Sequence, residues 1–384
     1  MPAPVPSSRP PGSEGTPSIR VPWLSGLLAR DARTGIRRAI GELLAGRPIV
    51  VAARGAPDRM VVPVESLDAA GLAALHEAGA PTLVVSATRA AALGAHAEVS
   101  EIALPRALGP HALMALAAGA GAAPPTPPVR ADVAADAAIE LVKLAKLLPA
   151  VVSVRADAVG DTAELARVDA EAALAFRAGH ARSLRRVSSA PVPMRAVSDA
   201  ELVVFRDELG EHWSLIVVGR PDASGPVPVR LHSACLTGDA FASVRCDCGD
   251  QLQMALAKIA ALGGGALLYL AQEGCGLGLA NKMRAYGLQE QGLDTVDANT
   301  TLGFEADERR YDVAAAMLEA VGIREVALLT NNPSKLAALR AAGIDVRERI
   351  PLLAPVGVRN RGYLEAKRRR AGHLMGDVPL RAVG

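Results

Sequence analysis

Apolar positions along the chain follow two spacings, and each predicts a different kind of element. Helical spacing predicts helices over residues 37–46, 67–78, 113–118, 131–148, 162–178, 251–262, 280–291, 310–321 and 333–342. Short apolar runs or period-two alternation predict strands over residues 48–53, 82–86, 150–154, 200–206, 212–219, 227–233, 266–270, 325–330 and 345–350. Ser66 is expected to cap the helix over 67–78. The pattern therefore predicts an α/β (α+β) protein.

The order of these elements changes near residue 185. Before it, helices and strands alternate, which indicates an α/β domain with a mostly parallel sheet. After it, three successive alternating strands indicate an antiparallel sheet or barrel, followed by helices and further strands. We expect a disordered tail over 1–34, a first domain over 35–184 with an internal Gly/Ala/Pro-rich linker at about 119–130, and a second domain of mixed sheet or barrel with helices over 185–384.

Composition excludes several classes of partner. The 42 basic and 40 acidic residues leave a formal net charge of +2, so the chain has no overall excess of charge for a nucleic-acid backbone or an anionic membrane. Aromatic residues make up only 3% and leave few stacking platforms for single strands. No apolar run is long enough to span a bilayer, and the N-terminus lacks the pattern of a signal peptide. We expect a cytoplasmic protein.

Three of the four cysteines, Cys235, Cys246 and Cys248, lie within fourteen residues. Three thiolates so close together suit one Zn²⁺ whose fourth position is left to water, as in a catalytic site. A buried thiol cluster or a redox pair is the alternative from spacing alone. Further along, Gly274-Cys-Gly-Leu-Gly-Leu joins a predicted strand to a predicted helix, a combination that suits an anion such as phosphate.

Ordered motifs fill the second half of the chain. They are Leu231-His-Ser-Ala-Cys-Leu-Thr-Gly-Asp, Arg245-Cys-Asp-Cys-Gly-Asp-Gln-Leu, Tyr269-Leu-Ala-Gln-Glu-Gly, the stretch 281–295, Asp307-Glu-Arg and Leu329-Thr-Asn-Asn-Pro-Ser-Lys. From about residue 185 to 353 the chain resembles GTP cyclohydrolase II, the zinc enzyme that opens riboflavin biosynthesis. The resemblance implies the release of formate and pyrophosphate from GTP, which leaves 2,5-diamino-6-(5-phosphoribosylamino)pyrimidin-4(3H)-one.

The same resemblance implies roles for individual residues. Cys235, Cys246 and Cys248 match the family's zinc ligands. Asp307 matches its base, and Tyr286 matches a tyrosine that holds the attacking water or the developing charge. Arg309 matches a proposed arginine nucleophile, and a purely charge-stabilising role is the alternative because the pKa of arginine lies above about 12.

The resemblance also implies a nucleotide site and its ions. Its residues are Arg230, Leu231, His232, Ser233, Ala234, Gln251, Glu273, Gly274, Cys275, Thr295, Thr330 and Lys335. Gln251 and Glu273 are expected to face the donor-rich edge of guanine, and Mg²⁺ to accompany the triphosphate. We expect one Zn²⁺ per chain, GTP as the ligand, no nucleic acid or membrane as partner, and a homodimer.

Two positions depart from the family's usual pattern. Ala234 stands where Glu is usual, and Cys275 stands where Arg is usual. Three readings follow: an ordinary cyclohydrolase, a paralogue that retains the formyl group or takes another nucleotide, and a nucleotide-binding or assembly protein in which Cys275 closes the zinc site as a fourth ligand.

The first domain resembles, more weakly, 3,4-dihydroxy-2-butanone 4-phosphate synthase, which is fused to cyclohydrolase II in many bacteria. The likeness rests on Ala39-Ile-Gly-Glu-Leu-Leu-Ala-Gly-Arg-Pro-Ile-Val-Val. The family's acidic metal-binding loop is replaced here by Ala53-Arg-Gly-Ala-Pro-Asp-Arg-Met. We therefore expect a degenerate domain without that activity.

Overall fold

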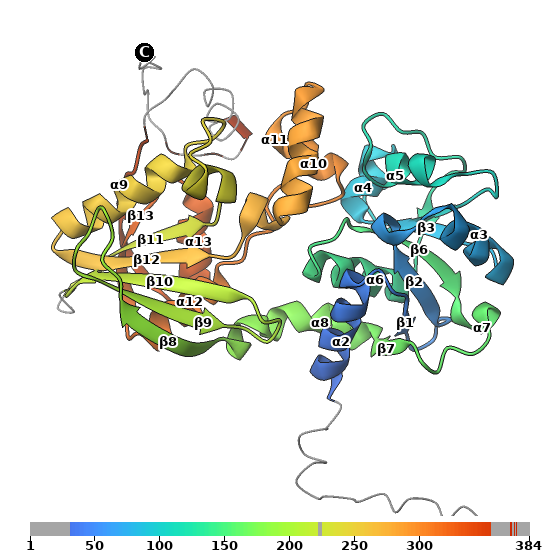
Figure 1. Cartoon of the computed structure of the whole chain (residues 1–384), viewed down its shortest axis with the longest axis horizontal. Coiled ribbons are helices and arrows are strands. Elements are labelled where there is room, and N and C mark those ends of the chain that lie inside the picture. The colour runs from blue at the N-terminus through green and yellow to red at the C-terminus, as the bar shows by residue number, and fades with distance from the viewer. Residues whose placement is uncertain (1–30, 222–224, 355–368, 371, 373, 375–384) are drawn as a thin grey trace, which may run out of the picture.

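Two seven-stranded mixed sheets, each covered by helices, make up the protein (Figure 1). The computed structural model describes residues 31–221, 225–354, 369–370, 372 and 374. We call residues 31–184 the N-terminal unit and residues 185–354 the C-terminal unit. The predicted fold class is confirmed, and the second sheet is open rather than a barrel because β14 and β8 are its two edges.

The N-terminal sheet has the order β5-β4-β3-β6-β2-β1-β7. Its strands are β1 (Ile49–Ala52), β2 (Arg59–Pro63), β3 (Thr82–Val85), β4 (Ser100–Ala103), β5 (Val129–Arg130), β6 (Ala150–Arg155) and β7 (Ala166–Asp169). Of the six pairings among the described residues, five are antiparallel and only β1 with β7 is parallel. The expectation of a mostly parallel sheet was wrong, because β1 and β2 form a hairpin and β6 inserts between β2 and β3.

Aspartates cap four of the helices of the N-terminal unit. The helical elements are α2 (Ala32–Leu44), η1 (Val64–Ser66), α3 (Ala69–Ala78), α4 (Ala87–Ala92), α5 (Pro110–Ala118), α6 (Val133–Leu144), α7 (Ala156–Val159), α8 (Ala170–His180) and η2 (Ala181–Ser183). The N-caps of α2, α3, α6 and α8 are Asp31, Asp68, Asp132 and Asp169, each of which accepts a hydrogen bond from a first-turn amide. The cap of α3 is thus Asp68 and not the predicted Ser66, which ends η1.

Three further expectations for the N-terminal unit meet the structure. The helix predicted over 162–178 begins only at Ala170, because residues 166–169 alternate buried and exposed and pair with β1 as β7. Helix α2 begins at Ala32, inside the stretch predicted as a tail, whose residues 1–30 lie outside the described part of the chain. The predicted linker at 119–130 ends in β5, which pairs with β4. It is therefore a loop within this unit.

The C-terminal sheet has the order β14-β13-β11-β12-β10-β9-β8. Its strands are β8 (Arg185–Pro191), β9 (Ala200–Arg206), β10 (His212–Gly219), β11 (Val227–Ser233), β12 (Gly264–Leu270), β13 (Glu325–Leu329) and β14 (Asp345–Ile350). Strands β12, β11, β13 and β14 are parallel, whereas β10, β9 and β8 continue the sheet antiparallel from β12. The carboxyl ends of β11, β12 and β13 therefore meet at one edge, where open α/β sheets commonly bind ligands.

Two helices of the C-terminal unit lie between the sheets (Figure 1). The helical elements are η3 (Leu236–Ala240), α9 (Cys248–Ala261), η4 (Glu273–Gly276), α10 (Leu279–Glu290), α11 (Thr295–Thr301), α12 (Asp312–Ala320) and α13 (Pro333–Ala341). Leu288 of α10 and Phe304 after α11 are buried in the same apolar cluster as Leu83, Leu116 and Leu148 of the N-terminal unit. The two units therefore share a core. No helix in the described ranges has an apolar stretch long enough to cross a membrane.

Candidate functional site

A cavity of about 450 Å³ opens at the carboxyl edge of the parallel strands. Its basic lining residues are Arg230, Lys282, Arg309, Lys335 and Arg370, and its carboxylates are Glu273 and Asp307. The volume falls within the range of small-molecule sites, and the excess of cations favours a polyanionic ligand.

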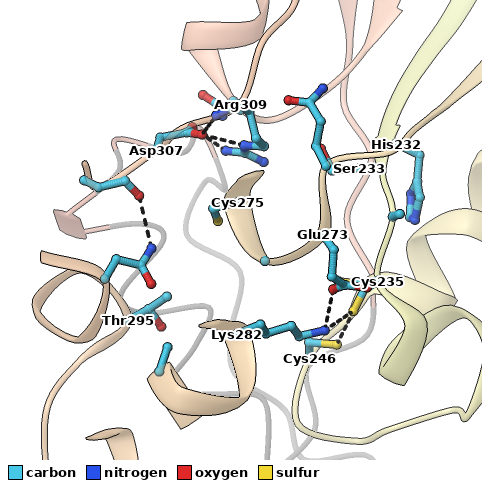
Figure 2. Close-up of a pocket in the computed structure, with 18 of the residues that line it drawn as sticks. His232, Ser233, Cys235, Cys246, Glu273, Cys275, Lys282, Thr295, Asp307 and Arg309 are labelled. Atoms are coloured by element: carbon cyan, nitrogen blue, oxygen red, sulfur yellow. Dashed lines mark hydrogen bonds and ion pairs between the residues drawn. The ribbon is translucent and has the colours of Figure 1, made fainter. Parts of the chain in front are cut away.

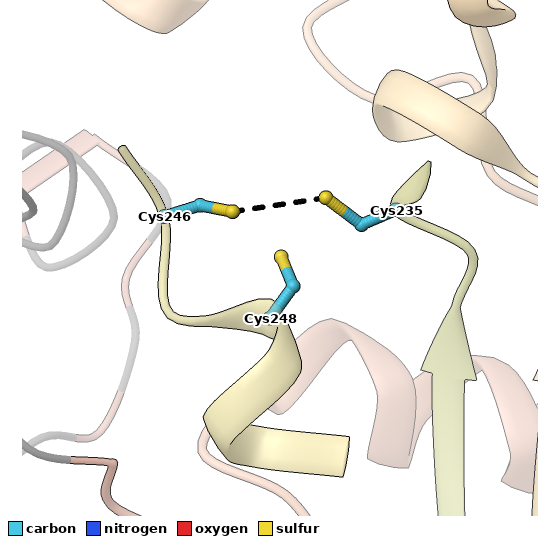
Figure 3. Close-up of side chains that lie close together, drawn as sticks. All are labelled: Cys235, Cys246 and Cys248. Carbon is cyan, nitrogen blue, oxygen red and sulfur yellow. Dashed lines mark hydrogen bonds between the residues drawn. The ribbon is translucent and has the colours of Figure 1, made fainter. Parts of the chain in front are cut away.

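Three thiols converge on one wall of this cavity (Figure 3). Cys235 follows the end of β11, Cys246 lies in the loop before α9, and Cys248 is the first residue of α9. Their sulfur atoms all lie within 4.8 Å of one another. Cys235 and Cys246 are buried, and Cys248 is partly exposed.

The three cysteine sulfur atoms are spaced to bind one zinc ion. The Sγ atoms of Cys235 and Cys246 are 3.7 Å apart, and two Zn–S bonds of about 2.3 Å in a tetrahedron require about 3.8 Å. At Gly238 a Cβ would stand 2.9 Å from the Cys246 sulfur and 3.2 Å from the Cys235 sulfur, so only glycine leaves room beside them. A hydrogen bond with Cys246 lowers the pKa of Cys235, whereas the same contact raises the pKa of Cys246. Three thiolates so close need a cation.

Asp239 braces the turn that presents Cys235. Its Oδ2 accepts hydrogen bonds from the Cys235 amide at 2.9 Å and the Tyr269 hydroxyl at 2.9 Å. Nε2 of His232 lies 3.1 Å from the same carboxylate, and the imidazole stacks on the Tyr269 ring. Burial lowers the pKa of His232 although the contact with Asp239 opposes this. His232 thus supports the thiol wall through one ring nitrogen.

Lys282 joins the thiol wall to an acidic residue. Its Nζ lies 3.2 Å from the Cys235 sulfur, 2.9 Å from Oγ1 of Thr237 and 2.7 Å from Oε1 of Glu273. Burial disfavours the ammonium charge, but the contacts with Glu273 and Cys235 prevail and raise the pKa of Lys282 above its usual value. The other carboxylate oxygen of Glu273 accepts a hydrogen bond from the Leu236 amide at 2.7 Å. This cation therefore neutralises negative charge beside the thiols.

Asp307 and Arg309 lie at the opposite end of the cavity from the thiols (Figure 2). Arg309 donates from Nε to Oδ1 of Asp307 at 2.7 Å and from Nη2 to Oδ2 at 2.6 Å, a bidentate pair. Burial opposes the charge of Arg309, but the neighbouring Cys275 and Asp307 prevail and hold its pKa well above the usual value. The guanidinium is therefore a fixed cation at this end.

Tyr286, a residue of α10, is close to two cations. The Arg245 guanidinium is 4.3 Å from the centroid of its ring, and Nζ of Lys282 is 5.6 Å from it. Burial raises the pKa of Tyr286. Its hydroxyl thus stays protonated at neutral pH and is available as a hydrogen-bond donor.

Buried polar atoms with unused bonding capacity also line the cavity. Nε of Arg230, Nδ1 of His232 and Oγ of Ser233 have no hydrogen-bond partner within the described ranges. The other nitrogens of Arg230 donate to the Leu329 carbonyl at 3.0 Å and to Oε1 of Gln251 at 2.5 Å. Burial lowers the pKa of Arg230 to about 10, so it remains cationic at neutral pH. Orphaned buried groups of this kind are expected where a polar ligand completes the bonding.

The glycine-rich turn after β12 has a different role from the one its sequence suggests. The amides of Leu277 and Gly278 donate to carbonyls within the turn, so they are not directed at a ligand. A Cβ at Gly276 would stand 2.9 Å from the Glu308 backbone, and one at Gly278 would stand 3.1 Å from Cβ of Lys146. Of these glycines Gly274 lines the cavity. Close packing, rather than anion binding, requires Gly276 and Gly278.

Cys275 is not part of the cluster of Cys235, Cys246 and Cys248 and lies beside Arg309 (Figure 2). Its backbone has a φ of 60°, a left-handed conformation shared with Gly274. The alternative in which Cys275 closes the zinc site as a fourth ligand is therefore contradicted by the geometry.

Comparison with known proteins gives the family. The sequence profile of GTP cyclohydrolase II matches residues 185–351. A GTP cyclohydrolase-2 of Xylella fastidiosa (strain Temecula1 / ATCC 700964) is 42% identical over 346 residues, which cover 88% of this chain and 86% of that protein. The chain belongs to the GTP cyclohydrolase II family. The predictions of this family, of a GTP cyclohydrolase II enzyme (EC 3.5.4.25) and of riboflavin biosynthesis are thereby confirmed.

Two further matches cover less of the chain. A GTP cyclohydrolase-2 of Azospirillum brasilense is 49% identical over 62% of this chain and 64% of its own. A solved structure of RibBX, a two-domain 3,4-dihydroxy-2-butanone 4-phosphate synthase from A. baumannii, is 18% identical and covers 83% of this chain and 99% of its own, with a TM-score of 0.29. The Xylella alignment extends far into the N-terminal unit, which is thus shared with a second cyclohydrolase.

The cavity of this GTP cyclohydrolase II brings together most residues expected from its sequence. All of them line it except Leu231, whose side chain is 1% exposed and packs into the core. Alternation along β11 turns Leu231 away from the site, and its carbonyl instead accepts a hydrogen bond from Nζ of Lys335 at 2.7 Å. Lys282 and Asp239 were missed by sequence reasoning. The position of Lys282, four residues before Tyr286 on one helix face, was the available signal.

Proposed function

We propose that GTP binds in this cavity with its guanine ring towards the three thiols and its triphosphate towards Arg309 and Lys335. The observation that carries the proposal is the convergence of Cys235, Cys246 and Cys248 at one end of a cation-rich cavity whose other end holds the Asp307–Arg309 pair. One Zn²⁺ held by the thiolates would supply Lewis acidity that makes water nucleophilic near neutral pH.

At the guanine end, three side chains have proposed tasks. Tyr286, protonated at neutral pH, donates a hydrogen bond to the attacking water or to the charge that develops at C8. Gln251 and Glu273 accept hydrogen bonds from the amino edge of guanine. Both oxygens of Glu273 already have one donor each, and each keeps a free lone pair for a ligand.

At the phosphate end, Arg309 stabilises the charge that develops as pyrophosphate leaves. Its raised pKa favours this role over that of a covalent nucleophile, which requires the neutral form. The pair with Arg309 orients the Asp307 carboxylate, which we assign as the proton acceptor at this end because it matches the base of the family. Thr330 directly follows β13 and adds a hydroxyl for the phosphates, Lys335 in the first turn of α13 adds an ammonium group, and Mg²⁺ would shield the remaining charge.

The remaining nucleotide contacts come from the β11 end and from α11. Arg230, His232 and Ser233 offer the donors at the strand end. Ala234 lines the cavity beside them, but its amide donates to the Leu270 carbonyl, and Thr295 lies at the first turn of α11. The expectations of a degenerate 3,4-dihydroxy-2-butanone 4-phosphate synthase-like N-terminal domain, of a homodimer and of a cytoplasmic location stay predictions.

The deciding experiment identifies the products from GTP. Purified protein with zinc content measured by elemental analysis is incubated with GTP and Mg²⁺, and formate, pyrophosphate and the pyrimidine product are quantified. We expect formate and pyrophosphate in equal amounts. Pyrophosphate without formate would instead support a paralogue that retains the formyl group. This hypothesis is suggested by Ala234 and Cys275, which stand where Glu and Arg are usual. If neither formate nor pyrophosphate is released, the proposal is contradicted.

A further inference from the structure

The loop between α11 and α12 carries Asp307 and Arg309 but contains no helix or strand over residues 304–310. Both side chains line the cavity, whereas the intervening Glu308 does not. Without regular backbone bonding, the position of such a loop depends on its side-chain and tertiary contacts.

Glu308 makes its contacts with the N-terminal unit. One carboxylate oxygen forms an ion pair with Lys143 of α6, and the other lies 4.0 Å from Nη1 of Arg177 of α8. The Glu308 side chain is only 9% exposed and that of Lys143 14%, so water screens this pair little. The Glu305 amide also donates to Oε1 of Glu308 at 3.0 Å. The charged residue between the two site residues is thus fixed by a different sheet unit.

The start of the loop is held by the same unit. Oγ of Ser86 donates to the Gly303 carbonyl at 2.5 Å, and Nη1 of Arg89 donates to the Thr301 carbonyl at 2.7 Å. Arg89 is 1% exposed and uses its other nitrogens on carbonyls at the end of α5. These contacts connect the end of α11 to the N-terminal core.

The C-terminal unit contacts this loop through uncharged partners and through Asp312 of α12, which pairs with Arg310. Oε1 of Gln272 accepts from the Arg310 amide at 2.5 Å, and its Nε2 donates to the Arg310 carbonyl at 2.8 Å. The Glu308 amide donates to the Cys275 carbonyl at 3.0 Å. Within the described ranges, the ion pairs of Glu308 all come from the N-terminal unit.

We propose that the N-terminal unit holds the loop 303–310 in its working position and that Lys143 is a positioning residue for Asp307 and Arg309. The inference rests on the proposed roles of these two residues. It gives the N-terminal unit a function in the cyclohydrolase reaction that does not require a site of its own. Because a displacement of about 1 Å at reacting groups can cost about 100-fold in rate, a single interunit ion pair is enough to matter.

The test compares two interunit ion pairs in the full chain. Lys143→Gln removes the pair at the loop, and Arg33→Gln removes the pair between Arg33 of α2 and Glu208, which lies in the β9–β10 turn and does not line the cavity. We expect Lys143→Gln to lower kcat about 10- to 100-fold while KM for GTP changes less than about threefold. Arg33→Gln should keep kcat within about twofold, and Lys143→Arg should restore most of the loss.

Hydrogen exchange gives a readout that does not need turnover. In Lys143→Gln, amides of residues 303–310 should exchange about tenfold faster than in the unaltered protein, and in Arg33→Gln they should not. The double variant Lys143→Gln/Glu308→Gln should have a kcat no lower than that of the slower single variant, because both substitutions remove the same ion pair.

The outcomes separate this inference from the proposed function. If the unaltered protein releases no formate, the proposed function fails, and the exchange measurement still decides whether Lys143 holds the loop. If the unaltered protein is active and Lys143→Gln changes neither kcat nor exchange in 303–310, the positioning role is overturned. Equal losses in Lys143→Gln and Arg33→Gln also overturn it, because they would show general destabilisation.

Discussion

In the N-terminal unit Arg59 reaches two carboxylates, whereas in the C-terminal unit Arg230 ends in a cavity with its Nε unpaired. Arg59 donates to Asp132 at 2.9 Å and to Glu101 at 3.0 Å. Glu101 also accepts from the Thr82 hydroxyl at 3.2 Å. Both units have a seven-stranded mixed sheet and an apolar core. What differs between the two arginines is whether every guanidinium nitrogen has a partner within the protein.

This contrast separates an arginine that stabilises its own sheet from one whose bonding a ligand can complete. A polar cluster that satisfies itself stabilises the sheet and offers nothing to a ligand, whereas unpaired buried donors are costly unless a ligand completes them. In the N-terminal unit, residues 53–58 form the turn between β1 and β2. This turn has the sequence Ala53-Arg-Gly-Ala-Pro-Asp in place of the acidic loop that the resemblance to the synthase would predict here. The predictions below test whether the polar groups of the cavity serve the reaction, whereas the fully paired, or saturated, cluster of Arg59, Glu101 and Asp132 serves stability.

The largest effect is expected from Cys246→Ser. Removing one of three thiolates should reduce zinc content to a small fraction of one ion per chain and lower formate release by about 1,000-fold or more, because the source of nucleophilic water is lost. Cys275→Ser is the matched control for metal content and should retain zinc, since Cys275 is not in the thiol group. Normal turnover by Cys246→Ser would rule out the zinc mechanism.

Asp307→Asn should have the next largest effect. Loss of the proton acceptor should lower kcat by about 100- to 10,000-fold with a smaller change in KM. Asp132→Asn is the counterpart in the saturated cluster and should leave kcat unchanged, because Asn still caps α6. Steady-state kinetics of both variants with GTP measure this difference, and similar losses in the two would contradict the contrast between the units.

Cys275→Arg should produce a smaller gain. Restoring the cation usual at this position should raise kcat/KM for GTP by about tenfold, the value of one charge-assisted hydrogen bond to phosphate. Because every residue here except glycine has the same left-handed strain, Cys275→Gln is a fair control for size and backbone. If arginine is no better than glutamine, the departure at Cys275 does not limit the enzyme.

The smallest effect on activity is expected from Arg59→Met. The variant leaves Glu101 and Asp132 without their cation, which should lower the free energy of unfolding by about 1–3 kcal/mol. The side chain of Arg59 is 14% exposed, so solvent screens this loss little. A lower midpoint of urea denaturation with unchanged kcat is the expected result. A large loss of kcat without loss of stability would show that the cluster serves the reaction.

Local sequence predicted most elements but not their partners. Helices over 251–262 and 333–342 match α9 (Cys248–Ala261) and α13 (Pro333–Ala341) within a few residues, because their apolar stripes are set by near neighbours. The short strands β2, β4, β5 and β7 were missed, since two to five residues carry little periodic signal. The antiparallel character of the first sheet also depended on β6, which comes late in the chain.

The sequence by itself indicated the cluster of Cys235, Cys246 and Cys248, because the three residues lie within fourteen positions of one another along the chain. Its ordered motifs also indicated the family and nearly all the residues of the cavity. Only the tertiary structure decided that Asp307 and Arg309 lie across the cavity from the thiols and that Lys143 pairs with Glu308, the residue between them. These contacts join residues distant in sequence, and sheet order and the shared core set them rather than local propensity.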